Sequence, residues 1–276
     1  MSRLLAVLFA LLAAVPAHAA IGEWQAGDHV RLRLIAARSA DGVVDGVVEL
    51  ELDPGWKTYW RSPGDSGIPP RLDFGASTGV SDPAIDFPAP ERSDDGFAVS
   101  NVYHGKVALP FRFAKTVAGG PIRLELAADL GVCDEICLPV ALTTGLDVPD
   151  GESDSAAAAQ IAEARAALPG PGRPGEFEIL SLKRAGGTDK LPVFEAAVRS
   201  HSAGDPVLFA ETPADWYPAA PTATGPAKSG EATFRFEVDR KTATTPLAGA
   251  AIRLTLKNSD AATERSFHLD ASGSPQ

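Results

Sequence analysis

Alternation of apolar and polar residues dominates this chain. Several segments carry an apolar residue at every second position, as strands do when one face lies in a core and the other in water. Proline and glycine are frequent between these segments, as the short turns of antiparallel sheets require. The pattern predicts strands at residues 29–35, 47–52, 122–126, 233–238 and 252–256.

One segment departs from the alternation. Residues 153–168 are rich in alanine and other good helix formers, and they begin with Ser153 and Asp154, which suit an N-cap. The proline- and glycine-rich run at residues 169–175 then ends the expected helix. This helix and its stop mark the expected boundary between two β-domains.

Strands that follow one another without intervening helices favour β-sandwiches over a parallel α/β sheet. The sequence therefore predicts an all-β protein with a first β-domain at residues 20–150 and a second at residues 175–272. A helical and Pro/Gly-rich linker at residues 151–174 joins them, and the tail at residues 271–276 is expected to fray.

The first residues have the features of a secretory signal peptide. Arg3 provides a basic start, residues 4–15 are continuously apolar, and Ala17 and Ala19 give the small-x-small pattern that signal peptidase recognises. The apolar run is shorter than the roughly 20 residues needed to span a bilayer. We expect residues 1–19 to be removed near Ala19/Ala20 and the mature chain to be periplasmic, without membrane insertion; a retained amphipathic anchor is the alternative.

The charge of the chain is informative about its partners. The formal net charge is −11, and the basic residues are scattered along the sequence. Nucleic acids and anionic membrane surfaces both attract a concentrated positive field, so neither is an expected partner.

The chain has two cysteines, Cys133 and Cys137. In an extended strand they would lie about 13 Å apart, at roughly 3.3 Å per residue, whereas a disulfide needs Cα atoms about 4.4–6.8 Å apart. The chain must therefore turn between them, in a hairpin or in one helical turn. The strand patterning on both sides favours a hairpin with the pair at its end, near water, where a disulfide exchanges readily.

Two other interpretations of the cysteine pair remain open. The bridge could be a passive staple of the hairpin, although closing a five-residue loop restricts the unfolded chain very little. A metal site is disfavoured, because no histidine neighbours the pair and Met1 is the chain's one methionine, so soft ligands are scarce. We expect neither a metal nor another cofactor.

Four ordered motifs carry a resemblance to a known family. They lie at residues 55–70, 86–92, 103–110 and 132–139, the last containing both cysteines. Together they resemble the N-terminal periplasmic domain of the DsbD family of thiol:disulfide interchange proteins. The likeness is greatest to its ScsB-type branch, which is associated with copper tolerance, and it covers most of residues 25–148.

The resemblance implies an immunoglobulin-like sandwich, with a second such domain like the extra domain of the ScsB branch. The cysteine pair would accept electrons from a membrane-embedded donor and pass them to thioredoxin-like periplasmic proteins, with Cys137 favoured as the residue joined to partners. Full-length relatives continue into a membrane domain that this sequence does not include, so a stand-alone form with a separate donor is expected.

The same resemblance implies a cap loop whose aromatic residue shields the cysteines. The matching stretch places Phe97 as the cap candidate, with Asp94 and Asp95 as its acidic neighbours. Phe97 lies in a Gly/Asp-rich loop, where a large apolar side chain needs a surface to cover. An anchor into the core is the alternative role for this residue.

Other conspicuous residues have structural interpretations. Trp56, Tyr59 and Trp60 are expected to fill a sandwich core, and Arg61 could pair with Asp65 in the turn that follows. In the second domain, the aromatic pair at residues 216–217 lies in a Pro/Ala/Thr-rich loop. It is expected to cap a sandwich end, with a docking patch as the alternative.

The leading functional hypothesis is a redox carrier of the protein-disulfide reductase type. Its Cys133/Cys137 pair would cycle between dithiol and disulfide through a mixed disulfide with a client. One alternative is a non-catalytic binding or docking module with a structural disulfide. Another is a copper-tolerance accessory protein, suggested by the branch resemblance alone.

Overall fold

The structure of the chain is a computed structural model. It describes residues 21–38, 43–115, 121–149, 155–201, 204–225, 229–259 and 261–276. The expected signal peptide at residues 1–19 lies outside the described residues. Within the described ranges, the one helix is too short and too polar to cross a bilayer.

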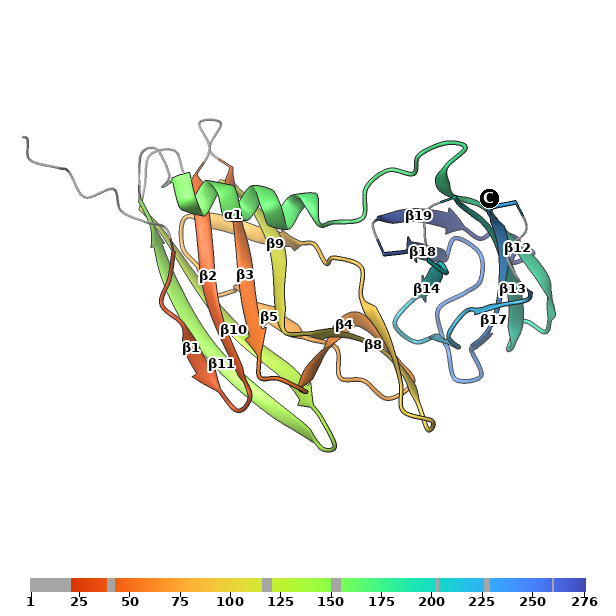
Figure 1. Ribbon diagram of the computed structural model, residues 1–276, viewed down its shortest axis with the longest axis horizontal. Coiled ribbons are helices and arrows are strands. Elements are labelled where there is room, and N and C mark those ends of the chain that lie inside the picture. Colours follow the sequence, from red (N-terminus) through yellow and green to blue (C-terminus); the bar gives the residue numbers. More distant parts are fainter. Residues whose placement is uncertain are drawn as a thin grey trace, which may run out of the picture.

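The first sandwich consists of two antiparallel sheets (Figure 1). One has the order β1 (Gln25–Gly27), β2 (Val30–Arg38), β3 (Val44–Leu52), β9 (Lys106–Lys115) and β6 (Val80–Ile85). The other has the order β11 (Cys137–Val148), β10 (Ile122–Cys133), β4 (Lys57–Gly64), β8 (Val99–His104) and β7 (Glu91–Asp94), and β5 (Arg71–Asp73) also pairs with β10.

The core of this sandwich follows from the alternation in the sequence. Leu32 and Leu34 on β2 and Leu124 and Leu126 on β10 are almost fully buried in one cluster between the sheets. Trp60 on β4 is completely buried in the same cluster. The strands predicted at residues 29–35, 47–52 and 122–126 are thus confirmed, with β10 extending further along the chain than the pattern indicated.

The predicted helix is present as α1 (Ser155–Ala166), and it lies across the outer face of β2, β3 and β9 (Figure 1). Ala157, Ile161 and Ala164 are its buried residues, spaced to share one side of a helix, and they pack against Ile35 and Val47. The helix therefore adds a layer to the first sandwich. The residue limits of the two domains stay a prediction.

The second sandwich has its own core of buried apolar residues. One sheet contains β12 (Phe177–Gly187), β13 (Pro192–Ser200), β17 (Glu231–Asp239), β15 (Tyr217–Pro218) and β16 (Thr222–Ala223). The other contains β14 (Val207–Glu211), β18 (Ala251–Lys257) and β19 (Ala262–His268). The strands predicted at residues 233–238 and 252–256 lie within β17 and β18, and the expected all-β, two-sandwich fold is confirmed.

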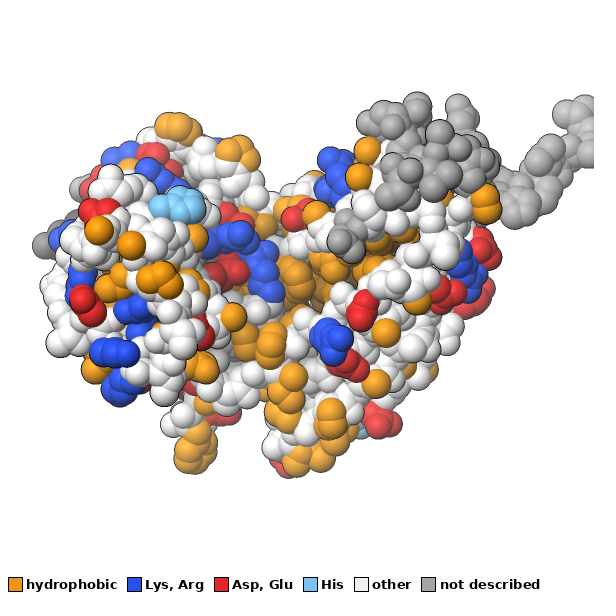
Figure 2. All heavy atoms as spheres, turned by 180° about the vertical axis from the view of Figure 1, so that it is seen from behind, with side chains coloured by type: hydrophobic (Ala, Val, Ile, Leu, Met, Phe, Trp, Pro, Cys, Tyr) orange, Lys and Arg blue, Asp and Glu red, His pale blue; other side chains and the backbone are white. Residues whose placement is uncertain are grey.

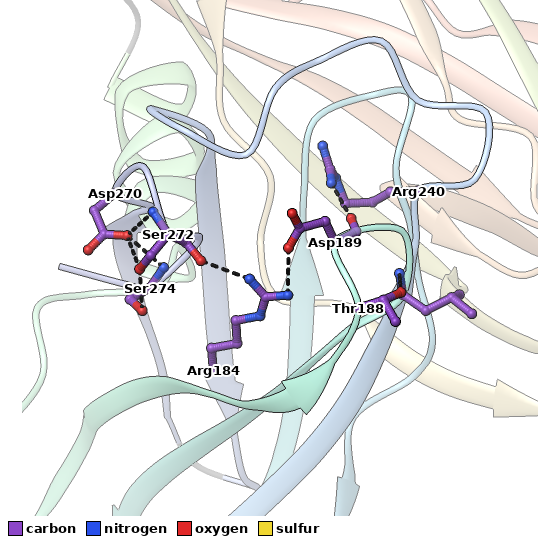
Figure 3. A network of polar contacts seen from close by, with 8 residues as sticks. Arg184, Thr188, Asp189, Arg240, Asp270, Ser272 and Ser274 are labelled. Carbon is purple, nitrogen blue, oxygen red and sulfur yellow. Dashed lines mark hydrogen bonds and ion pairs between the residues drawn. The ribbon is translucent and has the colours of Figure 1, made fainter.

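The C-terminal residues are held by hydrogen bonds, which corrects the expectation of a frayed tail (Figure 3). The Asp270 carboxylate accepts hydrogen bonds from the backbone N–H groups of Ser272 and Ser274, at 2.8 and 2.9 Å. Arg184 on β12 donates to the Ser272 carbonyl and to Asp189, both at 2.8 Å, so the tail is tied to the sheet. The contact between Arg184 and Ser272 joins residues 88 apart, so the sequence pattern carries no sign of it.

The two sandwiches meet at a polar and aromatic interface. Arg61, in the middle of β4, donates hydrogen bonds to both carboxylate oxygens of Glu211 at 2.7 and 2.8 Å and to Glu264 at 2.6 Å. Beside it, the buried Trp60 meets Phe209 of the second sandwich edge-on, with ring centroids 5.8 Å apart. The predicted pairing of Arg61 with Asp65 is therefore wrong. Asp65 instead accepts a hydrogen bond from the Val99 N–H at 3.0 Å.

Candidate functional site

The two cysteines end a long hairpin. Strands β10 and β11 pair in continuous register along twelve positions, and the last pair is Cys133 opposite Cys137. The two residues form a disulfide with Cα atoms 4.2 Å apart. Residues 134–136 form the turn, closed by a hydrogen bond from the Asp134 N–H to the Ile136 carbonyl at 3.1 Å. The hairpin predicted from the sequence is thereby confirmed.

The two sulfur-bearing residues differ in exposure. Cys133 is 1% exposed, because its side chain packs with Tyr59 and Val102 in a small cluster of buried residues. Cys137, at the start of β11, is exposed. A thiolate that attacks this disulfide from solution therefore meets Cys137 first, and Cys133 would leave as the buried thiolate.

Tyr59 connects the disulfide to the middle of the sheet. It lies on β4, which pairs with the end of β10 through Thr58 opposite Val132. The Tyr59 hydroxyl oxygen lies 3.1 Å from Cys133 Sγ and 3.3 Å from Cys137 Sγ. Since a disulfide sulfur carries no proton, the hydroxyl is the donor. After reduction, the same group is placed to donate to the thiolate that forms.

The environment keeps this hydroxyl protonated. Burial is the main cause that raises the pKa of Tyr59 above its ordinary value of 10.0, and the negative charge of Asp95 adds to it. Because the pKa is higher in the folded than in the unfolded protein, the associated stabilisation is complete below pH 10. It is lost as the pH rises from 10 toward the folded pKa.

A Tyr59→Phe variant should keep the fold and lose this donor. We expect the reduced variant to react with a small disulfide about tenfold more slowly at pH 7, because a hydrogen bond to a charged sulfur is worth about 1.5–3 kcal/mol. Stopped-flow measurement of the reaction with a nitrothiobenzoate disulfide gives the rate. An unchanged rate would show that the hydroxyl has no influence on the thiolate.

The stretch expected to form the cap loop is the turn between β7 and β8. Asp94 accepts a hydrogen bond from the Gly96 N–H at 2.9 Å, and Asp95 accepts bonds from the N–H groups of Phe97 and Ala98, both at 2.9 Å. The Ala98 and Phe97 N–H groups lower the pKa of Asp95, with a further contribution from the positive charge of Lys57. These carboxylates therefore shape the turn.

Phe97 itself is 100% exposed. The alternative interpretation, an anchor into the core, is therefore wrong. The side chain does not pack against the disulfide in this structure either, and in Figure 1 the turn after β7 and the β10–β11 hairpin project from the same side of the first sandwich. The shielding role of Phe97 stays a prediction.

Exposed apolar residues gather around the disulfide. In the described part of the chain, two of the large hydrophobic side chains that are exposed lie close to the disulfide. Ile136, in the turn between the cysteines, is 63% exposed, and Ile68 is 45% exposed. Ile68 lies over Gly131, where an added Cβ would come within 2.9 Å of the Ile68 Cβ. Exposed apolar groups around a reachable disulfide are suited to a protein partner.

Among the described residues, no three His, Cys, Asp or Glu side chains are grouped as metal ligands would be.

The other aromatic residues of the motif at residues 55–70 have structural roles. Trp56 stacks on His29 with ring centroids 3.7 Å apart, and Trp60 fills the core as predicted. In the second sandwich, Trp216 is buried as the expected cap of a sandwich end, whereas Tyr217 is 64% exposed.

Comparison with known proteins identifies the first sandwich. Residues 31–146 match the family model described as the N-terminal domain of the thiol:disulfide interchange protein DsbD. This segment belongs to the DsbD N-terminal family. The matched residues include strands of both sheets of the first sandwich and both cysteines. It is a thiol:disulfide interchange module whose disulfide joins Cys133 and Cys137.

A solved structure extends the likeness beyond this module. The chain is similar to the N-terminal periplasmic domain of ScsB from Proteus mirabilis, with 22% sequence identity and a TM-score of 0.73. The similarity covers 91% of this chain and 99% of that chain, so the fold is shared across both sandwiches. A comparison with curated protein sequences gave no match.

Sequence reasoning assigned Tyr59 to the core and so missed its contact with both sulfurs. The signal was available in the alternation of β4. If Trp60 faces the core, then Tyr59 faces the opposite side of the sheet, where Cys133 also lies. What the sequence could not supply was the pairing of β4 with the end of β10.

Proposed function

We propose that the chain is a periplasmic redox carrier that passes reducing equivalents through the Cys133/Cys137 pair to thioredoxin-like proteins. The observation that carries this proposal is the exposure of Cys137 beside the buried Cys133, at the free end of a hairpin. The membership of this segment in the DsbD N-terminal family supports exchange as the chemistry. The signal-peptide features of residues 1–19 support the periplasmic location.

The proposed cycle transfers two electrons. A dithiol of a membrane-embedded donor attacks Cys137, releases Cys133 as a thiolate and then resolves the mixed disulfide, leaving the donor oxidised and the pair reduced. In the second half, the Cys137 thiolate attacks a disulfide of a thioredoxin-like client. Cys133 then attacks Cys137 Sγ, which releases the client as a dithiol and closes the Cys133–Cys137 bond.

The experiment that tests this proposal mixes the reduced protein with an oxidised thioredoxin and follows the thiols of both by alkylation and mass spectrometry. We expect one disulfide to form in the chain for each thioredoxin disulfide reduced. If oxidised thioredoxin and several other thioredoxin-fold proteins all stay oxidised against an excess of the reduced chain, the carrier function is wrong and the bridge is a structural staple.

We also propose that the Asp94–Phe97 turn closes over the reduced pair as a cap. The shape of the turn supports this, since Asp94 and Asp95 fix its backbone while the apolar Phe97 side chain is left in solvent. The turn is also anchored close to the disulfide: Asp65, which binds Val99 at its end, lies in the loop that packs on Tyr59.

A Phe97→Ser variant tests the cap. Because the side chain is fully exposed, the free energy of unfolding should change by less than about 0.5 kcal/mol. Oxidation of the reduced pair by glutathione disulfide should become about threefold faster, since a shielding group is lost from the thiols. Equal oxidation rates for the variant and the unmodified protein would rule out a shielding role for Phe97.

A further inference from the structure

A cleft of about 660 Å³ lies between the two sandwiches. One wall is the second half of β4, from Arg61 to Gly64, with the loop that follows it to Pro69 and Val99 on β8. The other wall is residues 210–221 of the second sandwich, which include the exposed Tyr217. Figure 2 shows the molecule as two lobes with hydrophobic side chains along the surface between them.

The walls of this cleft are largely apolar, and the four charged side chains that line it, Arg61, Asp65, Arg92 and Glu211, are two cations and two anions that are already hydrogen-bonded within the protein. Five prolines line it, and a proline offers no N–H donor; they are Pro63, Pro69, Pro213, Pro218 and Pro221. The Arg61 charge is neutralised by Glu211 and Glu264, and Arg92 donates to the carbonyls of Pro221 and Leu208 at 2.9 and 2.7 Å. The cleft is therefore suited to an uncharged occupant with apolar side chains.

The loop that lines the cleft also packs on the residue that contacts the disulfide. Gly67 in its wall lies against the Tyr59 ring, where an added Cβ would come within 2.5 Å of Tyr59 Cδ1. The other end of the same side chain, its hydroxyl, contacts both sulfurs. Ile68, beside Gly67, is exposed between the cleft and the hairpin end. The exposed Ile68 thus provides an apolar surface close to both the hairpin end and the cleft.

We propose that this cleft binds the uncharged polypeptide segment that adjoins the reactive cysteine of the redox partner, with Tyr217 of the second sandwich as its main contact. The proposal rests on the redox-carrier function proposed above. It gives the second sandwich a role in choosing partners, because that sandwich supplies the wall opposite the disulfide-bearing module.

The test uses the full reduced protein and two activated disulfides. One is the nitrothiobenzoate conjugate of N-acetylcysteine amide, and the other is that of an uncharged ten-residue peptide with leucine, valine and proline around a single cysteine. The Cys137 thiolate attacks the cysteine sulfur and releases nitrothiobenzoate, which is read by its absorbance. Cys133 then closes the disulfide and frees the thiol. The quantity measured is the ratio of the second-order rates of release, peptide over amide.

We expect a rate ratio of about ten for the unmodified protein. The ratio should fall about fivefold in Tyr217→Ser, because the aromatic contact is removed. It should fall by a similar factor in Ala214→Trp, because the new side chain fills the cleft from an exposed position. Tyr217→Phe should retain the ratio. Lys183→Ser, at an exposed position on β12 that does not line the cleft, serves as the matched control and should also retain it.

Each outcome bears on one of the two proposals. A ratio near one in the unmodified protein, or a ratio unchanged by both Tyr217→Ser and Ala214→Trp, overturns the role of the cleft while leaving the carrier function intact. Failure of the reduced protein to release nitrothiobenzoate from either conjugate instead contradicts the carrier function itself.

Discussion

A Cys133→Ser variant should accumulate a mixed disulfide through Cys137, whereas a Cys137→Ser variant should accumulate about a hundredfold less under the same conditions. Cys137 is exposed and can reach the disulfide of a client, and without Cys133 the resulting bond has no internal thiol to resolve it. The thiol of Cys133 is 1% exposed behind Tyr59 and Val102. Incubation with periplasmic extract, followed by non-reducing electrophoresis and mass spectrometry, measures both adducts.

The two single variants serve as controls for each other, since each removes the disulfide and leaves one thiol. A Cys133→Ser/Cys137→Ser double variant gives the background of non-covalent capture. Adducts of thioredoxin-fold proteins on Cys137 are expected. Equal trapping by the two single variants would contradict the assignment of Cys137 as the partner-facing sulfur.

An Arg61→Ala variant should destabilise the protein by about 3 kcal/mol, because it leaves Glu211 and Glu264 largely buried without their shared cation. This value lies at the low end for breaking a buried ion pair, since the three side chains keep between 15% and 26% exposure. We also expect the two sandwiches to separate more readily. Urea unfolding monitored by tryptophan fluorescence measures the first effect, and small-angle scattering measures the second.

The matched control is Arg71→Ala, which removes an ion pair with Asp73 at 3.7 Å in which both side chains are at least half exposed. Its cost should be below about 1 kcal/mol, as for other surface ion pairs. If Arg61→Ala is no more destabilising than Arg71→Ala, the Arg61 cluster does not hold the two sandwiches together.

The sequence alone is sufficient for the five regularly alternating strands, the helix and the cysteine hairpin, because each depends on local patterning or on the reach of the chain between residues four apart. The shorter and less regular strands, such as β5, β7 and β15, carry no such pattern. The alternation of Leu124 and Leu126 with polar residues predicts that both leucines face the core. The spacing of Cys133 and Cys137 predicts a turn between them, because a disulfide cannot form across an extended chain. These features need no knowledge of what lies opposite in space.

The failures concern contacts between distant segments. Arg61 was paired with its near neighbour Asp65, but its partners Glu211 and Glu264 lie 150 and 203 residues further along the chain. Tyr59 contacts Cys133, which lies 74 residues further along the chain, and this contact depends on the pairing of β4 with the end of β10. The cap role of Phe97 stays a prediction, because its side chain projects into solvent and any contact with the disulfide would need the turn to close.

The standard reduction potential of the Cys133–Cys137 disulfide tests most directly whether this disulfide takes part in thiol–disulfide exchange. Equilibration of the full chain in a series of glutathione buffers, followed by alkylation and mass spectrometry, gives the value. An exposed disulfide that closes a five-residue loop should have a potential above about −300 mV, within reach of cellular dithiols. A potential well below about −300 mV would instead mark a structural bridge and contradict the redox account.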